Sequence, residues 1–167
     1  MKQAIACSLP IVAIFGLLAT TSVIADDQPV PFLATFSGEA RFDPPEAPTQ
    51  ILFNGSGYAA HLGNTTNVGV LAPIAFVPTT ECALGVGIPH INMETFTAAN
   101  GDQLVLEMKD LACPIDYSFL IFRGTGNWTV VHGTGRFAGA TGSGTVVGGG
   151  DFVRGVFEIF LEGEISY

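Results

Sequence analysis

A glycine-rich stretch, residues 132–150, is the feature that most restricts what this chain can fold into. It holds 8 of the 21 glycines. Three of its residues match the Gly-x-Gly-x-x-Ala spacing of a dinucleotide-binding loop, but that loop belongs to a βαβ unit with a helix after the glycines. The 17 residues that follow read as one strand instead. We therefore interpret the stretch as a tight turn that packs Phe137 and Ala140 against the end of a sheet, before a strand that begins near Thr145.

Apolar residues alternate with polar ones through most of the remaining chain, which is typical of half-buried strands. In the last segment one face is apolar and the opposite face carries Glu158, Glu162 and Glu164. An Asn-Gly pair at residues 100–101 predicts a hairpin with a type I′ turn. The expected strands are residues 32–42, 51–63, 64–70, 91–99, 103–110, 116–124, 126–133, 145–148 and 152–167. Such a pattern, without an amphipathic helix, predicts an all-β fold that closes as a single antiparallel eight-stranded barrel.

The N-terminus has the three regions of a signal peptide. Lys2 supplies a positive charge, residues 11–18 are apolar, and the sequence Val-Ile-Ala ends at residue 25. We expect residues 1–25 to be a signal peptide, residues 26–31 to be a loose segment and residues 32–167 to form the barrel domain. The protein is thus expected to be secreted or periplasmic.

Two cysteines remain after this predicted cleavage, Cys82 and Cys113. In an oxidising compartment they are expected to form a disulfide, and they lack the Cys-x-x-Cys spacing of metal or redox sites. The chain has 15 acidic and 6 basic residues, a net charge of −9. Such a charge argues against nucleic acid and against peripheral binding to anionic membranes.

Five segments together resemble one superfamily. The glycine stretch contains GTGRFAGATGSG, residues 133–144, and the others are FSGEA (36–40), GYAAHLGNTT (57–66), FTAANGDQL (96–104) and GEISY (163–167). They resemble the allene oxide cyclase and dirigent-like β-barrels, in particular an uncharacterised secreted bacterial branch. The resemblance implies an eight-stranded antiparallel barrel with a homo-oligomeric assembly. It transfers no catalytic residue, because the strands that carry those residues differ too much, and it implies no cofactor.

Three residues are the candidates for a ligand-binding site. His61 follows small residues in the strand expected at 51–63, so it is expected to face inward with space beside its ring. His90 and Glu94 flank Asn92 at alternating positions and are expected to share a face. For each group a structural role stays open: a hydrogen-bonded histidine near a barrel end, or solvent-facing polar residues at a strand junction. No metal site is predicted, because too few metal donors come together in the sequence.

These observations favour an exported barrel that binds a small, largely apolar molecule. If the protein is an enzyme, a cyclase or isomerase is expected. One alternative is a non-catalytic structural or surface-interaction barrel whose interior is filled by the 13 phenylalanines. A less favoured alternative is an outer-membrane barrel, suggested by the terminal aromatic residue.

Overall fold

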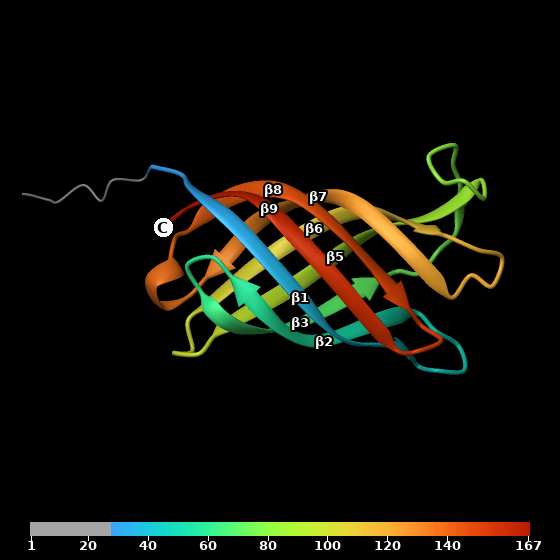
Figure 1. Ribbon diagram of the computed structural model, residues 1–167, viewed down its shortest axis with the longest axis horizontal. Helices are drawn as coiled ribbons and strands as arrows, with labels where there is room; N and C mark the ends of the chain where they lie inside the picture. Colours follow the sequence, from blue (N-terminus) through green and yellow to red (C-terminus); the bar gives the residue numbers. More distant parts are fainter. Residues whose placement is uncertain (1–27) are drawn as a thin grey trace, which may run out of the picture.

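The computed structural model describes residues 28–167, which form nine strands and one short 3₁₀-helix (Figure 1). The predicted signal peptide lies outside the described residues. The elements are β1 (Val30–Asp43), β2 (Gln50–Ala59), β3 (Gly63–Ala72), β4 (Val77–Pro78), β5 (Val86–Ala98), β6 (Gln103–Pro114), β7 (Ile121–Gly133), η1 (Gly135–Phe137), β8 (Thr141–Asp151) and β9 (Val156–Ser166).

Eight of these strands close into an antiparallel barrel. Their order is β3-β2-β1-β9-β8-β7-β6-β5, and β3 pairs with β5 to complete the circle. The two-residue β4 pairs only with the start of β5. Closure leaves no long unpaired strand edge. The predicted all-β, eight-stranded antiparallel barrel is therefore confirmed.

Alternating burial along the strands fixes which residues face the interior. In β1, Phe32, Ala34 and Phe36 are buried, whereas the residues between them are exposed. The same alternation continues through β9, where Leu161 and Ile165 are fully buried. In β1 and β9 the apolar face of the alternation is the face that points inward, because a strand places successive side chains on opposite faces.

Several predicted boundaries are wrong. β1 begins at Val30, inside the segment expected to be loose. A break was expected at residues 124–126, but β7 runs through them without interruption. β8 begins at Thr141 rather than near Thr145, so more of the glycine stretch is strand than expected. Glycines inside these paired strands, which read as turns in the sequence, account for the last two errors.

The two ends of the barrel differ (Figure 1). At one end lie the connections 44–49, 73–85, 115–120 and 152–155, which include the longest, 73–85. At the other end lie the three-residue β2–β3 turn, the four-residue β5–β6 turn and the 134–140 connection that contains η1, and here the C-terminus also lies. We call the first of these the end with the long loops.

The interior contains two apolar clusters. The larger fills the half of the barrel near the short turns, and its most buried members include Phe32, Phe96, Trp128 and Phe137. The smaller lies at the end with the long loops. No helix within residues 28–167 is long and apolar enough to span a membrane.

The predicted disulfide is present between Cys82 and Cys113, whose Cα atoms lie 5.3 Å apart. It ties the 73–85 connection to the last residues of β6, at the end with the long loops. The bridge closes a loop with a sequence separation of 31 residues. In the chain-entropy treatment a loop of this size stabilises the fold by about 3–4 kcal/mol.

Candidate functional site

A cavity of about 200 Å³ opens at the end of the barrel with the long loops. Its wall is mostly apolar and comes from all eight barrel strands and from the long connections. The apolar side chains that line it are Phe42, Pro48, Ile51, Phe53, Leu71, Ile74, Phe76, Ile88, Met108, Ala112, Phe119, Phe122, Val146, Phe152, Phe157 and Ile159. A concave apolar pocket with a few convergent polar groups is the usual form of a small-molecule site.

Five phenylalanines form a continuous series of ring contacts at this cavity, which we call the aromatic collar. Phe42 stacks on Phe152, with ring centroids 4.6 Å apart, and Phe152 meets Phe122 at 5.9 Å. Phe76 contacts both Phe122 and Phe119, at 6.2 and 5.4 Å. Phe119 and Phe122 both line the cavity. Three members lie in loops, so the collar extends the apolar wall beyond the barrel strands.

A strip of polar residues lies on one side of the cavity. It consists of His90, Asn92 and Glu94 from β5, and of Asp110 from β6, which is paired directly with His90. The alternation of β5 turns the first three inward, as their spacing predicts. Along β5, the next inward residue is Phe96, which belongs to the larger apolar cluster. The polar strip therefore lies between the filled half of the barrel and the open cavity.

Glu94 is fully buried and accepts two hydrogen bonds from amides. Asn67 Nδ2 donates to Glu94 Oε2 at 2.6 Å, and Asn92 Nδ2 donates to Oε1 at 2.9 Å. Burial raises the pKa of Glu94 above its ordinary value of 4.5, and Asp110 adds to this effect. The two amide hydrogen bonds oppose the shift without cancelling it. The carboxyl group thus favours its neutral form more than an exposed glutamate does.

The carboxyl group of Glu94 fits in the barrel only because its neighbour on β3 has no side chain. Gly69 is the direct partner of Glu94 across the two strands. A Cβ at Gly69 would lie 2.7 Å from Glu94 Cδ and 2.7 Å from Oε1. The glycine therefore provides the volume that the carboxyl group occupies.

His90 and Asp110 form a close side-chain pair between β5 and β6. His90 Nδ1 lies 3.0 Å from the carbonyl oxygen of Ile88, and Nε2 lies 2.5 Å from Asp110 Oδ1. A carbonyl oxygen has no proton, so Nδ1 must donate one to that contact. Nε2 is therefore the ring atom that faces the Asp110 carboxyl group.

Three residues of this site were missed by sequence reasoning: Asn67, Gly69 and Asp110. The sequence feature that could have identified them is the alternation of their strands, which turns these positions inward. The alternation of β3 places Asn67 and Gly69 on the same face as the buried Thr65 and Leu71. Asp110 is the next inward position after the buried Met108. What the sequence could not give is which strands are neighbours across the barrel.

The prediction that His61 faces inward from a strand is wrong. β2 ends at Ala59, which pairs directly with Gly63, so the chain must reverse within residues 60–62. His61 therefore occupies the turn, with a φ of 70°. Its Nε2 lies 2.9 Å from the carbonyl oxygen of Pro31, and its ring packs near Tyr167. This places His61 at the opposite end of the barrel from the cavity.

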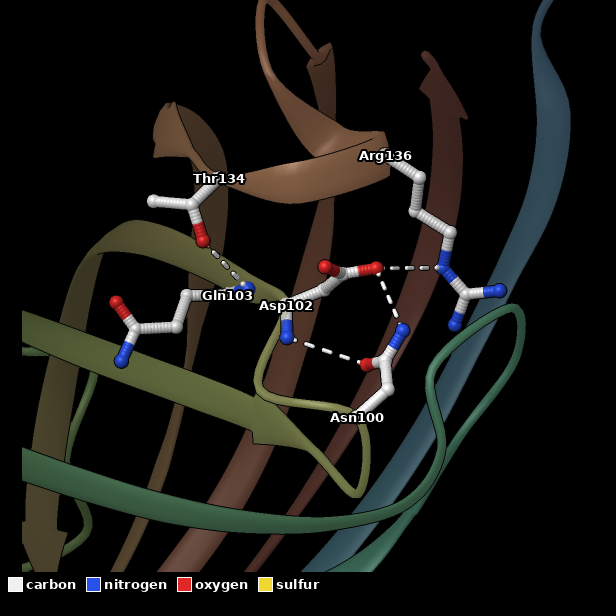
Figure 2. A network of polar contacts seen from close by, with 5 residues as sticks. All are labelled: Asn100, Asp102, Gln103, Thr134 and Arg136. Atoms are coloured by element: carbon white, nitrogen blue, oxygen red, sulfur yellow. Dashed lines mark hydrogen bonds and ion pairs between the residues drawn. The ribbon is translucent and has the colours of Figure 1, made fainter.

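At that opposite end the glycine stretch forms the expected tight turn, with Phe137 and Ala140 packed against the barrel. Figure 2 shows how this turn is joined to the β5–β6 turn. Thr134 Oγ1 accepts a hydrogen bond from Gln103 N, and Arg136 pairs with Asp102 at 3.4 Å. Gly135, with a φ of 59°, lies against the Asp102 carboxylate, where a side chain would collide.

The β5–β6 turn itself differs from the predicted type I′ turn. It spans four residues, and only Gly101 has a positive φ. Asn100 instead uses its side chain: Oδ1 accepts from Asp102 N at 3.1 Å, and Nδ2 donates to Asp102 Oδ2 at 2.8 Å (Figure 2). These contacts stabilise a four-residue loop, which is longer than the two-residue loop of a type I′ hairpin. The network serves the architecture of the end opposite the cavity.

Within residues 28–167, no group of three or more His, Cys, Asp or Glu side chains is arranged to hold a metal ion. Comparison of the chain with protein-family models, with curated proteins and with solved structures gives no significant match. The site is therefore interpreted from its own geometry.

Proposed function

We propose that this protein is an exported barrel that binds a small, largely apolar molecule in the cavity at the end with the long loops. The observation that carries the proposal is a cavity of about 200 Å³, with an apolar wall and one polar strip. A cavity of about 150 Å³ with apolar walls is large enough for benzene. The volume here therefore suits a compact ring with one or two substituents.

Three further features support this proposal over its alternatives. Apolar side chains fill one half of the barrel, whereas in the other half the phenylalanines line a cavity instead of filling it, which favours binding over a purely structural role. Charged residues such as Glu39, Glu158 and Glu162 point outward from neighbouring strands β1 and β9, whereas the band of a membrane barrel that faces lipid is apolar. The Cys82–Cys113 bridge is consistent with export to an oxidising compartment.

A second candidate function is catalysis of a cyclisation or isomerisation. The observation that favours it is the raised pKa of Glu94 next to the cavity. A carboxyl group that stays protonated closer to neutral pH can act as a general acid. In this version of the proposal the apolar wall sets the shape of the substrate and Glu94 supplies the proton.

The test of binding is an NMR titration with methylcyclohexane, a hydrocarbon of suitable size. We expect amide shifts to change around the cavity in the wild type. Ala112→Leu, which adds volume to the cavity wall, is expected to reduce these changes. The matched control is Thr125→Leu, an exposed position on the neighbouring strand. Equal responses in both variants, or no response in the wild type, would contradict the proposal.

A further inference from the structure

Buried side-chain oxygen atoms in the polar strip, and in the adjoining Asn67, lack a hydrogen-bond donor. Asn67 Oδ1 and Asn92 Oδ1 are buried and accept no hydrogen bond within residues 28–167. Asp110 Oδ1 has only its contact with His90. All three atoms are acceptors. Native proteins rarely leave buried polar atoms without partners, so the group missing from this region is a hydrogen-bond donor.

The three acceptors do not all face the cavity. Asn92 and Asp110 line the cavity, whereas Asn67 lies behind Glu94 and holds it by its amide. The Asn92 side chain is fixed by its bond to Glu94, which leaves Oδ1 without a donor. A ligand that enters from the open end would therefore meet Asn92 and Asp110 first.

The ionisable residues of the strip already have partners inside the barrel. His90 contacts the Ile88 carbonyl oxygen and Asp110, and Glu94 accepts hydrogen bonds from Asn67 and Asn92. The rest of the cavity wall is mostly apolar. A carboxylate or an ammonium group would therefore lose its hydration without meeting an unpaired opposite charge.

We propose that the molecule bound in the cavity is a neutral alcohol with a compact hydrocarbon body, and that its hydroxyl group donates to Asn92 Oδ1 beside Asp110. A hydroxyl group can donate a hydrogen bond without carrying charge. A ketone or an ether of the same shape can only accept a hydrogen bond. The hydrocarbon body then lies among the phenylalanines of the aromatic collar. This inference rests on the proposed binding function and adds the chemical class of the ligand.

The test is an NMR or calorimetric titration of the intact, disulfide-bonded protein with four probes on one skeleton. These are 4-methylcyclohexanol, 4-methylcyclohexanone, 4-methylcyclohexylamine and methylcyclohexane. We expect the alcohol to bind at least about tenfold more tightly than the ketone, because only the alcohol satisfies a buried acceptor. The amine is expected to bind more weakly than the alcohol.

Substitutions at two asparagines test which residue accepts the hydrogen bond from the hydroxyl group of the ligand. Asn92→Leu removes the acceptor at similar size and is expected to reduce the preference for alcohol over ketone to less than about threefold, while methylcyclohexane still binds. Asn127→Leu, at an exposed position on β7, is the control and keeps the preference. The wild-type comparison decides the ligand class even if Asn92→Leu does not fold.

The outcomes separate this inference from the proposed function. If methylcyclohexane and the ketone bind as tightly as the alcohol, the cavity binds apolar molecules but the alcohol assignment is wrong. A stronger response to the amine would also overturn it. If the preference for alcohol persists in Asn92→Leu, Asn92 is not the acceptor. Failure of all four probes to bind would contradict the binding function itself.

Discussion

Replacement of Gly69 by alanine tests the packing beneath the cavity most sharply. In an ordinary strand this change is favourable by roughly 0.5–1 kcal/mol, because glycine loses more backbone entropy on folding. Here the new Cβ would lie 2.7 Å from the Glu94 carboxyl group, which is fully buried and held by two amides. A shift of the Glu94 carboxyl group away from the new Cβ would distort or break these two hydrogen bonds. Overpacking of this kind typically costs about 1–3 kcal/mol, so we expect a net destabilisation of about 1–2 kcal/mol.

The assay is urea unfolding followed by circular dichroism, with the disulfide intact, in a double-mutant cycle with Glu94→Ala. Once the carboxyl group is removed, Gly69→Ala is expected to be neutral or stabilising. The two changes should therefore couple by about 1–3 kcal/mol. Gly124→Ala is the control, because its Cβ would come no closer than 3.3 Å to another atom. An equal cost of Gly69→Ala in both backgrounds would refute the proposed packing.

Three further predictions concern the pH response, the disulfide and the turn opposite the cavity. The free energy of unfolding of the wild type, measured relative to that of Glu94→Gln, should fall as the pH rises above about 4.5. The reason is that the folded protein binds the Glu94 proton more tightly than the unfolded chain does. Parallel pH profiles of the two proteins would contradict the raised pKa. Cys82→Ser combined with Cys113→Ser should lower the free energy of unfolding by about 3–4 kcal/mol, and reduced wild type is the matching comparison in urea unfolding. Gly135→Ala should lower the melting temperature, because the new side chain meets Asp102 at a positive φ, and a melting temperature equal to that of the wild type would count against this.

The alternation of single strands was enough to predict the barrel and its inward faces. Phe32, Phe36 and Leu161 lie on the apolar faces of their strands and are buried, because burial on one face of a strand is a local property of the sequence. The ends of strands were harder to predict where glycines lie inside the strands, as in β7 and β8. Glycine favours turns in isolation, but in this barrel paired neighbours hold these residues in the extended conformation.

The candidate site could be predicted only in part. The spacing of His90 and Glu94 indicated a shared face, and the structure places both at the cavity. Their partners come from other strands: Asp110 lies across from His90 on β6, and Asn67 reaches Glu94 from β3. The pairing of β3 with β5 closes the barrel, although the short β4 lies between these two strands in the sequence. No local sequence pattern predicts this pairing. His61 was misplaced because the β2–β3 turn is fixed by the pairing of Ala59 with Gly63, whose register the sequence pattern does not show.

Native mass spectrometry of the protein, purified from the organism that makes it, would test binding in the cavity most directly. Any bound small molecule would then be extracted and identified. We expect a neutral, compact and largely apolar compound that is present with the wild type and reduced in Ala112→Leu. A protein that is empty when isolated gently, or a compound retained equally by Ala112→Leu, would contradict binding in the cavity.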